Sequence, residues 1–289
     1  MLGGPMPDIW TLPPPNIRSM VIPDPGYLFV EADLAGADAQ VVAWDANAPR
    51  LKAALRSGVD LHSANAQWLY GDGLDYRRHI HVNGMSLRDN AKRAVHAGNY
   101  GAGARTLSAS ISVPLATAEG FLHWWRAVEH PEIGQWHRRV DQTLHSRRMP
   151  TIHNAFGFRR IYTDLPDRLL GQALAWIAQS TVGLVINHAM LAVEAALPQL
   201  QLLAQVHDSL LWQCPLAEWP AIAPAILQAC AITVPYPDPL VIPVELKYSL
   251  ASWGEMQKWT PSPEETKWTM LPNSKQSAAP SSPWTSYAA

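Results

Sequence analysis

The sequence contains little cysteine and no excess of charge of either sign. Cys214 and Cys230 are the two cysteines among 289 residues, and they form no CxxC spacing. This usage argues against a disulfide framework and against a zinc site, and it is typical of a reducing compartment. The 22 Lys and Arg residues nearly balance the 24 Asp and Glu residues, for a formal net charge of −2. A globally basic surface is therefore excluded, and any contact with nucleic acid has to come from local patches.

Signals for export and for a membrane segment are also missing. The first ten residues, MLGGPMPDIW, have neither the basic nor the apolar region of a signal peptide. No uninterrupted run of about 18 apolar residues occurs. We therefore expect a soluble protein, whose length allows one large domain or two small ones.

Proline is abundant at both ends of the chain. Seven of the 25 prolines lie in residues 1–26. Because proline has no N–H and restricts the preceding residue, we expect an extended, proline-rich N-terminal arm there. Residues 260–289 are rich in Pro, Ser and Thr and have little periodic apolar pattern. We expect a disordered tail in that segment, since it cannot bury enough apolar surface to offset the entropy of ordering.

Between these ends the pattern predicts an α+β fold with an antiparallel sheet and a helical insertion. Ser86 is a candidate N-cap for a long helix that ends near Gly101. The sequence His207-Asp208-Ser209 lies between two apolar runs and predicts a tight hairpin. The expected elements are a strand at 26–33, a helix at 37–55, mostly helix over 60–166, a helix at 167–196, strands at 202–206 and 210–213, a helix at 216–231 and a strand at 240–250.

Two aspartates are candidates for a metal site. Asp33 ends the first predicted strand, and Asp208 lies at the tip of the predicted hairpin. A single Asp in a turn usually bonds its own backbone. If both strands belong to one sheet, however, the two carboxylates converge, and such a pair normally holds a shared proton or a divalent cation. Hard oxygen ligands without a Cys/His cluster favour Mg²⁺ or Mn²⁺.

A basic stripe follows the long predicted helix. Arg88, Lys92, His96 and Tyr100 are spaced four apart and therefore lie on one slowly drifting face. The like charges of Arg88 and Lys92 repel each other, and an anion such as a triphosphate would relieve that repulsion. Taken alone, the stripe is equally typical of a solvated basic face.

Three ordered segments resemble the motifs of the family A DNA polymerases. The run Asp33-Leu34-Ala35-Gly36-Ala37-Asp38-Ala39-Gln40 is similar to motif A. The spaced residues Arg88, Lys92, His96, Tyr100 and Gly101 are similar to motif B, and Gln205-Val206-His207-Asp208 is similar to motif C. Secondary matches are Asp60-Leu61-His62, Phe156-Gly157-Phe158-Arg159-Arg160, Gln179-Ser180-Thr181 and Trp253-Gly254-Glu255-Met256-Gln257-Lys258-Trp259.

The resemblance implies a right-hand polymerase without a thumb or an exonuclease domain. Palm residues are expected at 27–57, with motif A, and at 167–259, with motif C. Fingers are expected at 58–166, with motif B. Only 32 residues precede Asp33, and none of them resembles a thumb. We therefore expect the C-terminal part of a split or truncated phage-type replicase, which a separate N-terminal polypeptide completes.

The resemblance also implies a reaction, namely template-directed DNA synthesis on a primer 3′-hydroxyl by a two-metal mechanism. Its implied ligands are primer–template DNA, deoxynucleoside triphosphates and two Mg²⁺ ions, with Mn²⁺ as a possible substitute, in the cytoplasm of a bacterial or phage-infected cell. Lys92 is implied as an acid for the leaving pyrophosphate. The implied metal ligands are Asp33, Asp208 and the carbonyl of Leu34. The implied dNTP-binding residues are His62, Arg88, Lys92, His96, Tyr100 and Asp38, and the implied primer–template residues are Gly101, Arg159, Arg160, Gln179 and His207.

Departures from the family pattern leave alternatives open. Asp38 stands where the family commonly has Glu, which bonds the motif B tyrosine and blocks a ribose 2′-hydroxyl, and His96 stands where Phe or Tyr is usual. A single-subunit RNA polymerase of the phage type shares the run Lys92-Arg93-Ala94-Val95 and the run His207-Asp208-Ser209. A non-catalytic DNA-binding subunit that keeps the palm and fingers is the third reading.

Overall fold

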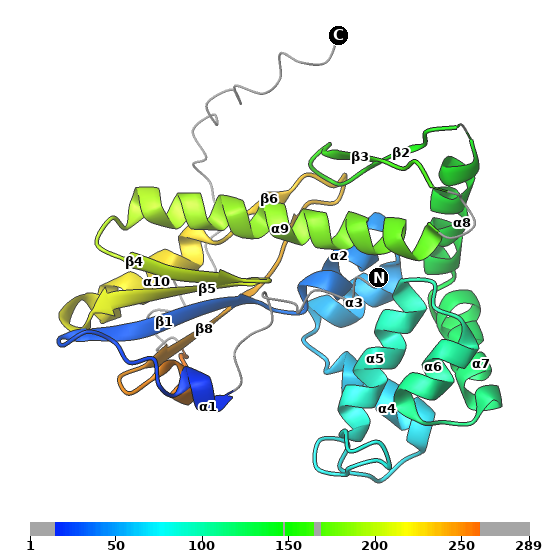
Figure 1. Cartoon of the computed structure of the whole chain (residues 1–289), viewed down its shortest axis with the longest axis horizontal. Coiled ribbons are helices and arrows are strands. Elements are labelled where there is room, and N and C mark those ends of the chain that lie inside the picture. The colour runs from blue at the N-terminus through cyan, green and yellow to red at the C-terminus, as the bar shows by residue number, and fades with distance from the viewer. Residues whose placement is uncertain (1–14, 147, 165–168, 261–289) are drawn as a thin grey trace, which may run out of the picture.

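The computed structural model describes residues 15–146, 148–164 and 169–260. Its centre is a five-stranded antiparallel sheet in the order β4-β5-β1-β8-β9 (Figure 1). The expected α+β architecture is confirmed. The strands of this sheet are β1 (Tyr27–Leu34), β4 (Gln201–Val206), β5 (Ser209–Pro215), β8 (Val244–Ser249) and β9 (Gln257–Lys258). Two smaller antiparallel pairs join β2 (Thr151–His153) to β3 (Arg159–Ile161) and β6 (Thr233–Val234) to β7 (Leu240–Val241).

The central strand β1 is buried on both faces of the sheet. Its residues Leu28, Val30 and Ala32 belong to the main core, whereas Phe29 packs with Leu211 and Trp253 on the opposite face. Because successive side chains of a strand point to opposite faces, this apolar run suits a strand that is covered on both sides. The strand therefore holds its last residues in a fixed place between its neighbours β5 and β8.

Two helices, α9 (Leu170–Ala196) and α10 (Trp219–Ala229), pack against the main sheet. By length and composition α9 is the one described helix that could cross a membrane. It runs over the sheet, in contact with β5 and α10, and on to the helices α2 (Ala37–Asp45) and α8 (Pro131–His145) (Figure 1). These contacts make α9 part of the packed core of the described residues.

A lobe of helices lies beside the sheet (Figure 1). Ser86 caps its helix α5 as expected, because its Oγ accepts a hydrogen bond of 3.0 Å from the backbone N–H of Asp89. Trp125, Trp136 and Phe121 are fully buried in this part of the chain. The helices are α2 (Ala37–Asp45), α3 (Pro49–Arg56), α4 (Leu61–Tyr70), α5 (Leu87–Asn99), α6 (Ala104–Ile111), α7 (Leu115–His123), the π-helix η1 (Trp124–Glu129) and α8 (Pro131–His145).

Three expected elements have different limits in the structure. The helix expected at 37–55 is two helices, because Asn47 has a φ of 54° and Pro49 starts the second one. The strand expected at 240–250 is split at Pro243, so that β7 and β8 belong to different sheets. Within the expected extended arm, Pro15–Arg18 forms the helical turn α1. Residues 1–14 of that arm and 261–289 of the expected tail lie outside the described residues.

Candidate active site

Asp33 and Asp208 lie side by side at the end of the central strand. Asp33 is paired with Ser209 across the β1–β5 register, so it is next to the turn that joins β4 to β5. The backbone N–H of Leu34 donates a hydrogen bond of 3.0 Å to the carbonyl of Asp208. His207 occupies the same turn with a φ of 53°, in the left-handed region. The sheet register thus brings together the two aspartates that the sequence analysis paired.

The electrostatics of the two carboxylates differ. Burial raises the pKa of Asp208, and the negative charge of Asp33 raises it further. Asp33 has a cationic neighbour, because the Nζ of Lys247 lies 3.1 Å from its Oδ2 and 3.0 Å from the Oε1 of Glu31. Glu31 is buried and also accepts a hydrogen bond of 2.9 Å from the indole of Trp253. Asp208 has no ion pair within the described residues, so its charge is the less compensated of the two.

This donor set fits a divalent cation. Both carboxylates are hard oxygen ligands, and the carbonyl of Leu34 follows directly on Asp33 in the chain. Among the described residues no group of three or more His, Cys, Asp and Glu side chains converges as a ready-made metal site. A cation held by Asp33 and Asp208 therefore has to complete its shell with water or with phosphate oxygens, as Mg²⁺ commonly does.

The basic face of α5 contributes phosphate-binding groups. Ala91, Ala94 and Val95 are buried and fix the orientation of the helix, which leaves Lys92 exposed. Lys92 has no hydrogen bond or ion pair to any described residue. Arg88 is held in place, because its Nε donates to Asp60 Oδ2 at 2.8 Å and to Oδ1 at 3.1 Å. Its terminal amino groups have no such partner in the described part of the chain.

His62 lies close to the positive charges of Arg88 and Lys92. Burial lowers the pKa of His62, and the positive charges of Arg88 and Lys92 lower it further, to about 4. The imidazole is therefore neutral at pH 7, and its buried Nδ1 has no hydrogen-bond partner within the described residues. The two cations beside this neutral ring create a positive potential that an anion would offset.

Asp38, His96 and Tyr100 connect the basic helix to the carboxylate pair. The Nδ1 of His96 lies 3.8 Å from the Oδ2 of Asp38, and the charge of Asp38 also raises the pKa of Asp208. Burial and the neighbouring Asp38 raise the pKa of Tyr100. The buried Tyr100 hydroxyl nevertheless has no hydrogen bond of good geometry to the described residues. All six residues expected to bind dNTP thus belong to one connected set of charges and rings.

The residues expected to bind primer–template are partly gathered. Arg160 and Gln179 line one hollow of about 250 Å³ together with Gln172, Ala175 and Trp176. Arg159, the neighbour of Arg160 in β3, is exposed but does not line this hollow. Gly101 has a φ of 74° and lies beside Leu174 and Leu170 of α9, and His207 is exposed in its turn.

Another hollow of the described chain lies away from these residues. It measures about 480 Å³, lies between α3, α4 and η1, and is walled by Trp68 and Trp124, whose rings stack at 5.3 Å. None of the expected site residues lines it. The candidate active site is therefore defined by its charges and not by this hollow.

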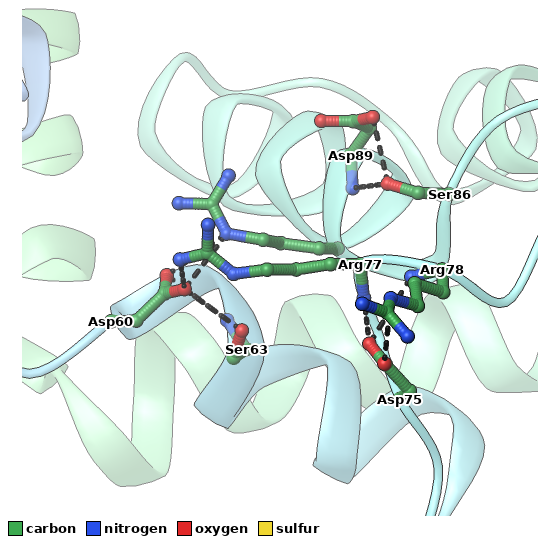
Figure 2. Close-up of polar contacts among 8 residues, drawn as sticks. Asp60, Ser63, Asp75, Arg77, Arg78, Ser86 and Asp89 are labelled. Carbon is green, nitrogen blue, oxygen red and sulfur yellow. Dashed lines mark hydrogen bonds and ion pairs between the residues drawn. The ribbon is translucent and has the colours of Figure 1, made fainter.

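The sequence analysis did not identify the ion-pair roles of three residues at the site, namely Asp60, Arg77 and Lys247. Asp60 binds both Arg88 and Arg77, whose Nη2 lies 2.7 Å from Asp60 Oδ2 (Figure 2). Asp60 begins one of the secondary motif matches, and that was a usable signal. Arg77 has none, since Arg78 beside it looks the same in sequence. Lys247 could be found only from the register that places it opposite Glu31.

Comparison with known proteins gives one family and one fold. The model of DNA polymerase family A matches residues 10–255. DNA polymerase I of Chloroflexus aurantiacus is 29% identical over 259 residues, which are 83% of this chain and 26% of that protein. The thermostable DNA polymerase I of Thermus aquaticus is 25% identical over 243 residues, 79% of this chain and 28% of that protein. The chain thus spans about a quarter of the length of these relatives.

A solved structure shares the fold. It is described as the POL domain of Pol1 from M. smegmatis in complex with DNA primer-template and dNTP. The TM-score is 0.68 at 20% sequence identity, over 83% of this chain and 42% of that one.

Proposed function

Because the chain belongs to DNA polymerase family A, we propose that it carries out DNA-directed DNA synthesis, in which a nucleotidyl group passes from a deoxynucleoside triphosphate to a primer 3′-hydroxyl. One observation carries this proposal. The carboxylates of Asp33, at the end of β1, and Asp208, in the adjacent turn, are linked through Asp38 and His96 to a basic helix face that has unpartnered donors among the described residues. Such an arrangement suits a substrate whose phosphates bridge a cation and a set of N–H groups.

In this proposal Asp33, Asp208 and the carbonyl of Leu34 hold two divalent cations, Mg²⁺ or Mn²⁺. Bound there, the ions would supply charge neutralisation and activation of the attacking hydroxyl. The protein itself mainly positions the reactants, since phosphoryl-type transfer depends on alignment and on stabilisation of charge. The raised pKa of Asp208 supports this assignment, because a second positive charge beside it would relieve the repulsion from Asp33.

The basic helix α5 would bind the triphosphate. Arg88 offers its free terminal amino groups, and Lys92 offers an exposed ammonium group that can also protonate the leaving pyrophosphate. Neutral His62 offers its unpartnered Nδ1 as a hydrogen-bonding group. His96 and Tyr100 lie further along the same face and would contact the nucleotide, with Tyr100 and the adjacent Gly101 under the templating pair.

We propose the palm at 27–57 and 167–259 and the fingers at 58–166, with the primer–template following the hollow of Arg160 and Gln179. Arg159 and His207 are exposed and are further candidates for phosphate contacts. The net charge of −2 supports a further proposal. Since phosphate contacts supply most non-specific affinity for DNA, a second polypeptide, such as the N-terminal part of a split replicase, would strengthen the grip. The bacterial relatives support a cytoplasmic location.

Primer extension by the purified full chain tests the activity. A self-priming DNA hairpin at low salt compensates for weak DNA binding, and the reaction contains Mg²⁺ with either deoxynucleotides or ribonucleotides. We expect deoxynucleotide extension that Asp208→Asn abolishes. Glu194→Gln, which removes an exposed carboxylate on α9, serves as the matched control and should keep full activity. Preference for ribonucleotides would favour an RNA polymerase, and no extension at all would favour a non-catalytic DNA-binding subunit.

A further inference from the structure

Arg77 binds the same carboxylate as Arg88, although Arg77 is not part of helix α5. It occupies the segment between α4 and α5, and its side chain reaches across to Asp60 (Figure 2). Its Nη2 lies 2.7 Å from Asp60 Oδ2, the oxygen that Arg88 Nε approaches to 2.8 Å. The Arg77 side chain is nevertheless 68% exposed. One carboxylate thus gathers two guanidinium groups at the start of α5, and one of them faces solvent.

The backbone of the segment holds Arg77 in this place. The carboxylate of Asp75 accepts a hydrogen bond of 3.2 Å from the backbone N–H of Arg77. The N–H of Arg88 donates to the carbonyl of Tyr76 at 2.8 Å, and that of Leu87 donates to the carbonyl of His79 at 3.0 Å. Residues 76–79 are therefore tied to the first turn of α5. The position of Arg77 beside Arg88 follows from these bonds as well as from the ion pair.

The two arginines leave positive charge and donors unused. Asp60 neutralises one of the two guanidinium groups, and exposed Lys92 adds a further positive charge on the same side of α5. A guanidinium carries five N–H donors, of which Arg77 uses its Nη2 and Arg88 its Nε in hydrogen bonds to described residues. Burial and the positive charges of Arg88 and Lys92 lower the pKa of His62, which lies close to the same group of cations. An anion with several oxygens suits both the charge and the donors.

We propose that Arg77 is a further triphosphate-binding residue, which Asp60 holds beside Arg88 and which donates its free N–H groups to the phosphate oxygens of an incoming dNTP. This inference rests on the proposed function, since it assigns a residue to the same substrate. Asp60 keeps both side chains extended before the nucleotide arrives. Binding then needs little additional ordering of either arginine, which favours affinity.

Arg78 provides a matched control one residue away. It carries the same charge in the same segment, but its Nε lies 3.7 Å from Asp75 and its side chain is 91% exposed. Arg77→Ala and Arg78→Ala therefore remove the same charge from neighbouring positions. Arg77→Lys keeps the charge and loses the planar fork of donors. A direct contact of Arg77 with phosphate predicts a different effect for each of these three variants.

Isothermal titration of the full chain with MgdATP, without primer–template, measures binding when no turnover occurs. We expect Arg77→Ala to raise the Kd about tenfold, Arg77→Lys to raise it less, and Arg78→Ala to change it less than twofold. Inorganic tripolyphosphate should compete for the site and lose affinity in the same order. In primer extension, the KM for dNTP should rise in Arg77→Ala while kcat stays within about twofold.

Equal effects of Arg77→Ala and Arg78→Ala would overturn the inference, because the loop charge and not a contact would then be responsible. An unchanged Kd in Arg77→Ala would overturn it too. If Arg77→Ala melts at a lower temperature than the wild type, Arg77→Gln, which keeps a polar side chain, replaces it under the same criteria. A wild-type chain that neither binds dATP nor extends a primer would overturn the proposed function together with this inference. Wild-type binding that Arg77 does not affect would overturn the inference alone.

Discussion

Replacing Lys247 by methionine should make the protein less stable. The Lys247 ammonium group lies between Glu31 at 3.0 Å and Asp33 at 3.1 Å, and the Glu31 side chain is only 9% exposed. Removing one partner of a buried ion pair costs about 3–5 kcal/mol. Because the Lys247 side chain is 30% exposed, water recovers part of that loss, and we expect a decrease of about 2 kcal/mol in the free energy of unfolding. A chain of this size should then melt roughly 4–8 °C lower.

The same change should make the carboxylate pair bind cations more tightly. Lys247 neutralises Asp33 in the structure, so a metal ion at Asp33 and Asp208 has to share that carboxylate with the ammonium group. Removing a unit charge about 4 Å from a divalent cation in a well-hydrated site is worth about 2 kcal/mol, or roughly thirtyfold in affinity. We expect the Mg²⁺ concentration for half-maximal primer extension to fall by that factor in Lys247→Met. A higher Mg²⁺ requirement would refute the reasoning.

The double variant Lys247→Met/Glu31→Gln separates the two effects. A neutral amide at position 31 can still accept the hydrogen bond from Trp253, so most of the lost stability should return. Asp33 stays uncompensated, so the lower Mg²⁺ midpoint should remain. Both quantities can be measured on one preparation, by urea unfolding and by Mg²⁺ titration of primer extension. A double variant as unstable as Lys247→Met would show that the charge of Glu31 is not the cause.

The pH dependence of this ion pair has a definite sign. Burial alone would lower the pKa of Lys247, but hydrogen bonds and charges from Glu31 and Asp33 raise it above 10.5. A group whose pKa is raised by folding stabilises the protein fully below its unfolded pKa and loses that contribution as pH rises through the folded value. The Lys247 contribution should therefore be constant through neutral pH and disappear above about pH 10.5, and it should be absent in Lys247→Met.

Three further outcomes are expected. Asp38→Glu should reduce ribonucleotide relative to deoxynucleotide incorporation about fivefold. The reason is that a longer carboxylate can bond better to the Tyr100 hydroxyl, which has no hydrogen bond of good geometry to the described residues. Equal incorporation ratios in competition assays would contradict this. Gly98→Ala should lower the free energy of unfolding by about 1–3 kcal/mol, since a Cβ there would meet Trp125 Cδ1 at 2.5 Å, whereas an unchanged urea midpoint would mean that the indole can move. Burial lowers the pKa values of His130 and His137 to about 4. The free energy of unfolding should therefore be highest above pH 6.5 and should fall between pH 6.5 and 4, by roughly 3 kcal/mol for each histidine. A urea midpoint that does not change over that range would refute the assignment of neutral, buried rings.

The sequence predicted those parts of the fold that local signals specify. The hairpin around His207 and the capped helix after Ser86 are confirmed, because turn and cap residues act on the backbone next to them. The helix expected at 37–55 was wrong as a single element, since the apolar pattern continues across the break at Asn47. The strand expected at 240–250 was split at Pro243, whose carbonyl nevertheless accepts a hydrogen bond of 2.8 Å from Ala35. The pattern of apolar residues does not show where an extended segment leaves one sheet and joins another.

The sequence predicted the position of a site residue where that residue belongs to a recognisable motif. Asp33 and Asp208 converge as expected, because both are placed by one pair of neighbouring strands. Lys247 was not predictable, since its place opposite Glu31 depends on the pairing of β1 with β8 across more than 200 residues. The role of Arg77 was not predictable either, because its ion pair with Asp60 depends on how the segment before α5 folds back onto that helix.

These long-range ion pairs affect how the site should bind nucleotide and metal. Arg77 and Arg88 share the carboxylate of Asp60, and Lys247 is shared by Glu31 and Asp33. Part of the charge of the site is thus balanced by protein groups before any ligand arrives. Asp60 holds the arginines in place for a triphosphate, whereas a cation competes with Lys247 for Asp33. That competition lowers the affinity for the cation alone, and a bound nucleotide whose phosphates also ligate the cation offsets the loss. We therefore expect the affinity for dATP to rise with Mg²⁺ concentration more steeply in the wild type than in Lys247→Met.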